Sequence, residues 1–246
     1  ENAFKISVKS RELYFEIAEN ENIDFDLTRK GAIQIYDNAV DFEKAKLKKH
    51  WIENVGCEWT ELSKDEVFEI EPALNKEKKV AGGIYTESDA SGDIHKYCVD
   101  LSRVLSSKYG VKFRFNEKVK DINGTSFPII STDKEDIPFD KVVICAGVKT
   151  QEFRNKFRDN FRIYPVKGYS ITIDLDDEIS KSAAPHVSIK DDHNKIVSSR
   201  LGNRLRVAGT AELAGENKEV REERITPLIE WVNNCFPEVN TENIIT

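Results

Sequence analysis

The segment 142–147, Val-Val-Ile-Cys-Ala-Gly, is the feature that most constrains what this chain can fold into. Extended to Val148, it is the longest uncharged apolar run that we find, and it is far shorter than the roughly 18 residues that a membrane-spanning helix needs. A short, continuously apolar run is typical of a parallel strand that is covered on both faces. We therefore expect a buried strand here, with Cys145 as an unreactive thiol in the core.

The residues before this run have the pattern of a nucleotide-binding α/β unit. Asp93 is predicted to cap a helix whose apolar residues continue to Tyr109, and Gly110 is predicted to end it. Cys98 falls on the apolar stripe of this helix, so a metal site formed with His95 is disfavoured. Alternation predicts strands over 111–115, 119–122 and 127–131, the last two joined by a two-residue Asn123-Gly124 turn.

The flanking sections are predicted to alternate between helices and half-buried strands. The elements that we expect are a helix over 10–20 that begins at Ser10, a strand over 31–36, a helix over 41–55, a short helix opened by a Ser63/Glu66 capping box, strands over 169–175 and 204–207, and a final helix over 227–235. Because a β-rich section, an α/β section and another β-rich section follow one another, the expected fold class is mixed, α+β and α/β, with two domains threaded through each other.

Charge and cysteine content narrow the class of protein. The 246 residues carry 37 Lys and Arg against 44 Asp and Glu, a net charge of -7, which disfavours a nucleic-acid partner. The first residues show no secretory signal, and the four cysteines contain no CxxC pair. We therefore expect buried free thiols and a cytoplasmic protein.

Two segments are candidates for a functional role, although the common catalytic and nucleotide-binding motifs are missing. No GxGxxG, GxxxxGK[ST] or GxSxG occurs in the chain. In the segment 164–169, Tyr-Pro-Val-Lys-Gly-Tyr, a cation, a glycine and an aromatic residue stand at the start of a strand, where backbone can approach a flat ligand. A turn with a solvated lysine explains this segment equally well. The segment 200–212 is predicted as a hairpin, which is more often structural than functional.

Four segments together resemble a known family. Three of them, 89–93 (Asp-Ala-Ser-Gly-Asp), 164–172 and 200–213, closely resemble the bacterial D-amino acid dehydrogenase small subunits, which belong to the FAD-dependent D-amino acid oxidase-like superfamily. The fourth, 141–147, resembles the second flavin-contacting strand of that superfamily. The resemblance implies oxidative deamination of a D-amino acid, in which a hydride passes from Cα to the flavin, and a quinone or another electron acceptor. It also implies a substrate domain with a mixed, largely antiparallel sheet and flanking helices, interrupted by part of an FAD-binding, Rossmann-like domain. The domain parts that it implies are 1–24 (connecting helix from the FAD domain), 25–80 and 156–246 (substrate domain) and 81–155 (part of the FAD domain).

The same resemblance implies site residues by matching positions. Val119 is expected to contact the adenosine side of FAD, and Ala146 and Gly147 to let a strand end pass close to FAD. Near the flavin ring the resemblance places Lys167, Gly168 and Tyr169; for the substrate pocket it implies Tyr169, Thr210 and Glu212. It implies no metal, and it identifies no catalytic residue.

The chain also departs from the family pattern. Relatives open with a strand, a GxGxxG turn and a helix that hold the FAD pyrophosphate, and they close with an arginine-containing segment; neither is present here. We therefore expect the 246 residues alone to be an inactive middle portion. The alternatives are an amine oxidase resembling glycine or sarcosine oxidase, and a non-catalytic accessory subunit without a flavin site. Peripheral contact with the inner face of the inner membrane is also an open expectation.

Overall fold

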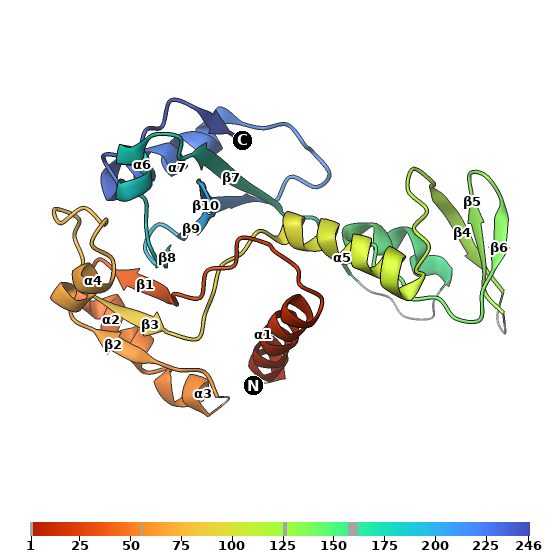
Figure 1. The fold of residues 1–246 in the computed structure, drawn as a ribbon, viewed down its shortest axis with the longest axis horizontal. Helices are drawn as coiled ribbons and strands as arrows, with labels where there is room; N and C mark the ends of the chain where they lie inside the picture. Colours follow the sequence, from red (N-terminus) through yellow and green to blue (C-terminus); the bar gives the residue numbers. More distant parts are fainter. Residues whose placement is uncertain (1, 55, 125–126, 157–161) are drawn as a thin grey trace. The chain divides into compact units, whose positions relative to one another are not determined.

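The computed structural model describes residues 2–54, 56–124, 127–156 and 162–246, which form two compact units (Figure 1). The larger unit comprises Glu1–Val104, Gly168–Ala211 and Glu219–Thr246, and the smaller unit comprises Leu105–Lys167 and Glu212–Lys218. Both units are therefore built from segments that lie far apart in the sequence. The division into substrate and FAD parts stays a prediction.

An eight-stranded, mostly antiparallel sheet is the framework of the larger unit. Its strand order is β11-β7-β10-β9-β8-β1-β3-β2, and β1 pairs in parallel with β8. The strands are β1 (Ala32–Tyr36), β2 (Thr60–Leu62), β3 (Gly82–Thr86), β7 (Lys167–Asp174), β8 (Ser188–Asp191), β9 (Ile196–Leu201), β10 (Arg204–Glu212) and β11 (Ile244–Ile245). With the helices below, this arrangement confirms the expected mixed, largely antiparallel fold class.

One face of this sheet forms the main core. Apolar residues alternate along β7 and β10, so Ile171 and Ile173 lie on the same side as Leu205 and Val207, and all four are fully buried. Helix α7 (Glu222–Cys235) contributes Leu228 and Val232 to the same apolar cluster. The opposite face of β7 and β10 carries polar residues and is described with the site below.

Two further helices, α4 (Lys64–Ile70) and α5 (Ile94–Tyr109), begin where local capping predicts. The capping box at α4 is present, because Ser63 Oγ accepts the N–H of Glu66 and the Glu66 carboxylate accepts the N–H of Ser63. Asp93 accepts the N–H groups of His95 and Lys96 at the start of α5, as expected. Further helices are α1 (Asn2–Asn20), α2 (Ala39–Lys46), α3 (Lys49–Glu53) and α6 (Glu178–Ala183).

The smaller unit contains a three-stranded antiparallel sheet and a 3-10 helix. Its strands, in the order β4-β5-β6, are β4 (Val119–Asn123), β5 (Ile129–Thr132) and β6 (Asp136–Pro138), and the 3-10 helix η1 is Gly147–Lys156. Strand β4 packs against η1.

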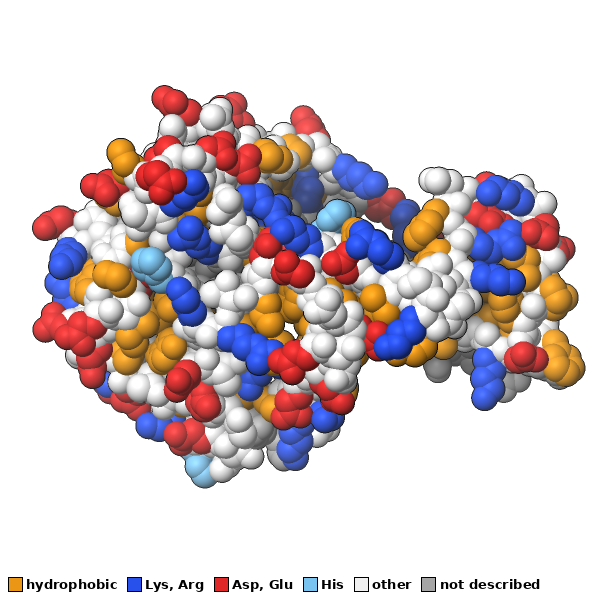
Figure 2. Space-filling view, viewed as in Figure 1, with side chains coloured by type: hydrophobic (Ala, Val, Ile, Leu, Met, Phe, Trp, Pro, Cys, Tyr) orange, Lys and Arg blue, Asp and Glu red, His pale blue; other side chains and the backbone are white. Residues whose placement is uncertain are grey.

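Apolar side chains are exposed on the molecular surface among charges of both signs (Figure 2).

Two predicted strands of the smaller unit are wrong. Neither 111–115 nor 142–147 is a strand in the structure. The prediction that Cys145 is buried is also wrong, since Cys145 is exposed and the neighbouring Val143 is 84% exposed. A strand exists only when a neighbour pairs with it, and among the described residues of this unit β4, β5 and β6 pair only with one another.

Other predicted boundaries differ from the structure. Helix α1 starts before Ser10, at Asn2, because no glycine or proline interrupts the residues between them. The predicted helix over 41–55 is two helices, since the N–H of Lys48 turns back to the carbonyl of Ala45. The two-residue Asn123-Gly124 turn is wrong: Asn123 pairs with Ile129, which leaves 124–128 as the loop, and 125–126 lie outside the described residues.

Two further expectations need correction. Helix α7 starts at Glu222 rather than near Pro227, and Pro227 lies inside its N-terminal half. Cys98 is exposed and does not join the core stripe of α5, and only Cys235 of the four free cysteines is buried. The apolar face of α5 is instead anchored by Tyr97, which packs with Phe25 and with α1.

Candidate functional site

The polar face of β7 and β10 is the best-formed candidate site. Because side chains alternate along a strand, Ser170 and Thr172 of β7 lie opposite the buried face, as do Arg204 and Arg206 of β10. Arg206 Nη2 donates to Ser170 Oγ at 2.9 Å, and Arg206 Nη1 to Thr172 Oγ1 at 3.3 Å. The two strands thus present hydroxyl and guanidinium groups on one surface.

A pocket of about 560 Å³ opens over this face. That volume is typical of sites for small molecules. Its walls come from β7, β9 and β10 and from the loop that leads into α5. The lining residues are Ala90, Ser91, Gly92, Asp93, Ile94, His95, Thr172, Val197, Ser199, Leu201, Arg204, Arg206 and Ala208.

Asp93 connects the loop to the sheet. One carboxylate oxygen accepts the first N–H groups of α5, and the other accepts Arg204 Nη2. Burial alone raises the pKa of Asp93, but the hydrogen bonds from Arg204 and from the backbone of α5 lower it overall. Asp93 therefore stays ionised and holds Arg204 in place, with Asp26 3.6 Å away as a second carboxylate.

Lys167 and Glu212, which the family resemblance singled out, form an ion pair. Lys167 Nζ lies 3.0 Å from a Glu212 carboxylate oxygen, and both side chains are largely covered, at 16% and 12% exposure. Lys167 begins β7 and Glu212 ends β10, the neighbouring strand of the sheet. The structure therefore brings these two predicted residues together. Their roles toward cofactor and substrate stay predictions.

The predicted residues Gly168, Tyr169 and Thr210 have different surroundings. Gly168 is exposed, and a Cβ added there meets no atom within 4 Å. The ring of Tyr169 is buried in the main core, and its hydroxyl lies 3.5 Å from the carbonyl of Glu219. Thr210 has a φ of 45° and donates its hydroxyl to the carbonyl of Arg224 at 3.3 Å. Of the three, only Gly168 presents open backbone.

The predicted residues Val119, Ala146 and Gly147 lie in the smaller unit. Val119 opens β4 and pairs with Thr132, and the carbonyl of Ala146 accepts the N–H of Lys149 at 3.0 Å. Gly147 has a φ of 54°, a left-handed conformation that favours glycine. A Cβ added at Gly147 meets no atom within 4 Å, so the backbone there is open to a ligand.

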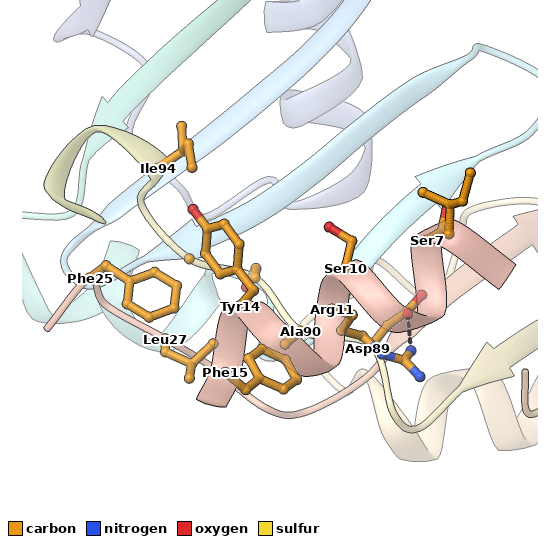
Figure 3. A pocket seen from close by; sticks show the side chains of 13 residues that line it. Ser7, Ser10, Arg11, Tyr14, Phe15, Phe25, Leu27, Asp89, Ala90 and Ile94 are labelled. Atoms are coloured by element: carbon orange, nitrogen blue, oxygen red, sulfur yellow. Dashed lines mark hydrogen bonds and ion pairs between the residues drawn. The ribbon is translucent and has the colours of Figure 1, made fainter. Parts of the chain in front are cut away.

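A second cavity, of about 480 Å³, lies between α1 and the segments at Phe25 and Asp89 (Figure 3). Arg11 Nη1 donates to Asp89 Oδ1 at 2.8 Å across it. Tyr14 stacks on Tyr97 with ring centroids 4.0 Å apart, and burial is the main cause that raises the pKa of Tyr14 to about 12. The buried Tyr14 hydroxyl has no hydrogen-bond partner among the described residues.

The described part of the chain contains no cluster of three or more His, Cys, Asp or Glu side chains that could hold a metal ion. None of the helices described is both long and apolar enough to cross a membrane.

Comparison with known proteins defines the class. A family model described as FAD dependent oxidoreductase matches residues 1–246, and the chain belongs to this family. It is 42% identical to D-amino acid dehydrogenase 3 of Mesorhizobium japonicum, over 98% of this chain and 59% of the relative. It is 32% identical to D-amino acid dehydrogenase of Neisseria meningitidis, over 97% of this chain and 57% of the relative. The chain thus spans less than two thirds of the length of these relatives.

Solved structures share the fold. Glycine oxidase from Geobacillus kaustophilus superposes with a TM-score of 0.84 at 20% identity, covering 95% of this chain and 62% of that one. L-proline dehydrogenase from P. horikoshii superposes with a TM-score of 0.84 at 14% identity, covering 98% and 64%.

FAD is the cofactor of this family, and the residues present fit part of a site for it. The open backbone at Gly147 and at Gly168 suits close approach by a flat ring or a sugar. The glycine-rich turn that grips a pyrophosphate does not occur in these 246 residues.

Proposed function

We propose that this chain is the substrate-binding portion and part of the FAD-binding portion of an enzyme that oxidises D-amino acids to 2-oxo acids and ammonia. The observation that carries the proposal is the 42% identity, over nearly the whole chain, to a protein named D-amino acid dehydrogenase 3. The coverage of only 59% of that relative supports the view that further residues complete the FAD site.

FAD, when bound, supplies the acceptor for the two electrons removed from the substrate. The chain's own residues bind FAD and the substrate and orient them. In the proposal, Val119 contacts the adenosine side of FAD through its backbone. Ala146 and the open Gly147 let the chain pass close to FAD. Lys167 and Gly168 lie toward the flavin ring.

For the substrate, the proposal uses Tyr169, Thr210 and Glu212. The carboxylate of Glu212 is neutralised by Lys167, 3.0 Å away, so it adds no net negative charge beside the substrate's carboxylate. Tyr169 is buried, so in this proposal it acts by supporting β7 from the core side. Thr210, whose hydroxyl donates to the carbonyl of Arg224, lies near the substrate pocket in this proposal.

The proposed partners are a small D-amino acid and a quinone or another electron acceptor. Electron transfer to a quinone would take place at a membrane surface, so peripheral contact with the inner face of the inner membrane is part of the proposal, and so is a cytoplasmic location. The net charge of -7 requires that any such contact use a local basic area.

Steady-state assays on the full gene product that carries these residues test the proposal. It is purified with FAD and supplied with a panel of D-amino acids and their L enantiomers, and dye reduction, oxygen consumption and ammonia release are measured. The expected result is ammonia release with D-amino acids, coupled to dye reduction. Rapid oxygen consumption with glycine or sarcosine would favour an amine oxidase. Absence of bound FAD would favour an accessory subunit.

A further inference from the structure

Arg206 has an unusual set of partners for an arginine in a pocket. Its guanidinium donates to two neutral hydroxyls, those of Ser170 and Thr172, and no carboxylate pairs with it among the described residues. A guanidinium has further N–H donors arranged as a planar fork, and this fork matches a carboxylate in two parallel hydrogen bonds. Arg206 is thus fixed in place by groups that leave its charge uncompensated.

The neighbouring Arg204 differs from Arg206 because it is paired with carboxylates. Arg204 lines the same pocket two residues earlier on β10, and its charge is matched by Asp93 and Asp26. The hydrogen bond that Arg204 donates to Asp93 is the largest of the effects that raise the pKa of Arg204. The single carboxylate in the pocket lining, that of Asp93, is therefore already paired with Arg204. The charge of Arg206 stays available to a ligand.

The rest of the pocket suits a small organic acid. Val197, Leu201 and Ala208 supply apolar walls beside the guanidinium, and Ile94 supplies another at the start of α5. A cation set against apolar walls in a pocket of about 560 Å³ favours a ligand that carries one carboxylate and a short apolar group. Arg206 is exposed in the structure, so such a ligand can reach it.

We propose that Arg206 is the charge partner of a carboxylate on the small molecule that binds this pocket. The inference rests on the proposed function in one respect: the carboxylate belongs to the amino acid substrate or to its 2-oxo acid product. It is either the α-carboxylate, which every such substrate has, or a side-chain carboxylate. Ser170 and Thr172 act as positioning residues that orient the fork of Arg206.

Binding and kinetics of the FAD-loaded full gene product test the proposal. Isothermal titration calorimetry measures the Kd of pyruvate, of 2-oxoglutarate and of inorganic phosphate, and steady-state kinetics give KM and kcat for D-alanine and D-glutamate. The variants are Arg206→Met and Arg206→Lys. Arg103→Met is the matched control, because Arg103 is 72% exposed on α5 and pairs with Asp100 in the same helix.

Arg206→Met is expected to raise Kd and KM by about 10- to 100-fold, the usual effect of losing a hydrogen-bonded charge partner. Arg206→Lys, which keeps the charge but not the fork, is expected to lose less, and Arg103→Met to lose nothing. An effect on D-alanine and D-glutamate alike assigns the α-carboxylate to Arg206. An effect confined to D-glutamate and 2-oxoglutarate assigns the side-chain carboxylate.

Unchanged Kd and KM in a normally folded Arg206→Met variant would overturn the proposal, as would tighter binding of phosphate than of either organic acid. If Arg206→Met does not fold, a Ser170→Ala, Thr172→Val double variant replaces it. This variant frees the fork of Arg206 and should raise Kd severalfold; an unchanged Kd overturns the proposal. If the wild-type protein binds pyruvate through Arg206 but oxidises no D-amino acid, the proposed function fails and the carboxylate site stands.

Discussion

Replacing Asp191 by asparagine should destabilise the larger unit far more than its small change in shape suggests. The buried Asp191 carboxylate accepts Trp231 Nε1 at 2.9 Å and the N–H of Asn194 at 3.0 Å, and it lies 3.0 Å from Lys78 Nζ. It therefore joins β8 to α7. An amide at this position would remove the negative charge and leave the Lys78 ammonium, in a side chain only 15% exposed, without this partner.

The pKa of Asp191 sets the size of the effect. Burial by itself raises this pKa, but hydrogen bonds from Asn194 and Trp231 and the charge of Lys78 outweigh it, and the pKa falls from 3.8 to about 2. That difference corresponds to about 2 kcal/mol of unfolding free energy at neutral pH. Because the folded-state pKa is the lower one, the contribution is complete above about pH 4 and is lost as the pH falls through about 2. With the unpaired Lys78, we expect a total cost of about 3 kcal/mol at neutral pH.

Urea denaturation followed by circular dichroism measures this cost. Asp191→Asn should lower the unfolding free energy by about 3 kcal/mol at neutral pH and by about 1 kcal/mol less than that near pH 3. Asp100→Asn is the control, since Asp100 pairs with the exposed Arg103 on the same helix and should cost under about 1 kcal/mol. The reasoning is refuted if Asp191→Asn costs no more than the control, or if its cost is independent of pH.

Three other predictions concern packing, capping and thiol reactivity. Leu228→Ala removes a fully buried side chain of α7 and should lower the unfolding free energy by about 2–5 kcal/mol, measured by urea denaturation; a loss below 1 kcal/mol would contradict the core as described. Ser63→Ala removes half of the capping box of α4 and should cost about 1 kcal/mol in the same assay, with no change expected if the box were not formed. A thiol-specific reagent should label the exposed Cys98 and Cys145 in the folded protein. It should label Cys235, whose pKa burial raises to about 12, only after denaturation, and early labelling of Cys235 would contradict its burial.

Helix starts could be predicted well where the cap is local. Ser63 and Asp93 each bond N–H groups within three residues of themselves, so the sequence pattern contains the whole interaction. Strands depend on partners elsewhere in the chain. The run 142–147 has the composition of a buried strand, yet no strand of the described residues pairs with it, and Cys145 is exposed as a result. Apolar composition alone does not show whether another strand pairs with this run.

Single sequence motifs could not predict the pocket. The alternation of Arg204 and Arg206 with Leu205 and Val207 indicates that both arginines share one face, and this signal was available in the sequence. That Asp93, more than a hundred residues earlier, pairs with Arg204 and leaves Arg206 without a carboxylate depends on tertiary contacts. The predicted pair of Lys167 and Glu212 came from family resemblance, and the structure brings its members within 3.0 Å.

Reduction of the bound flavin without oxygen tests the central claim most directly. The full gene product that carries these residues is purified with FAD, made anaerobic and mixed with single amino acids, while the visible flavin absorbance is followed. The account predicts that at least one D-amino acid bleaches the flavin within the mixing experiment and that its L enantiomer does not. A flavin that stays oxidised with every D-amino acid, or that is bleached equally by both enantiomers, would contradict it.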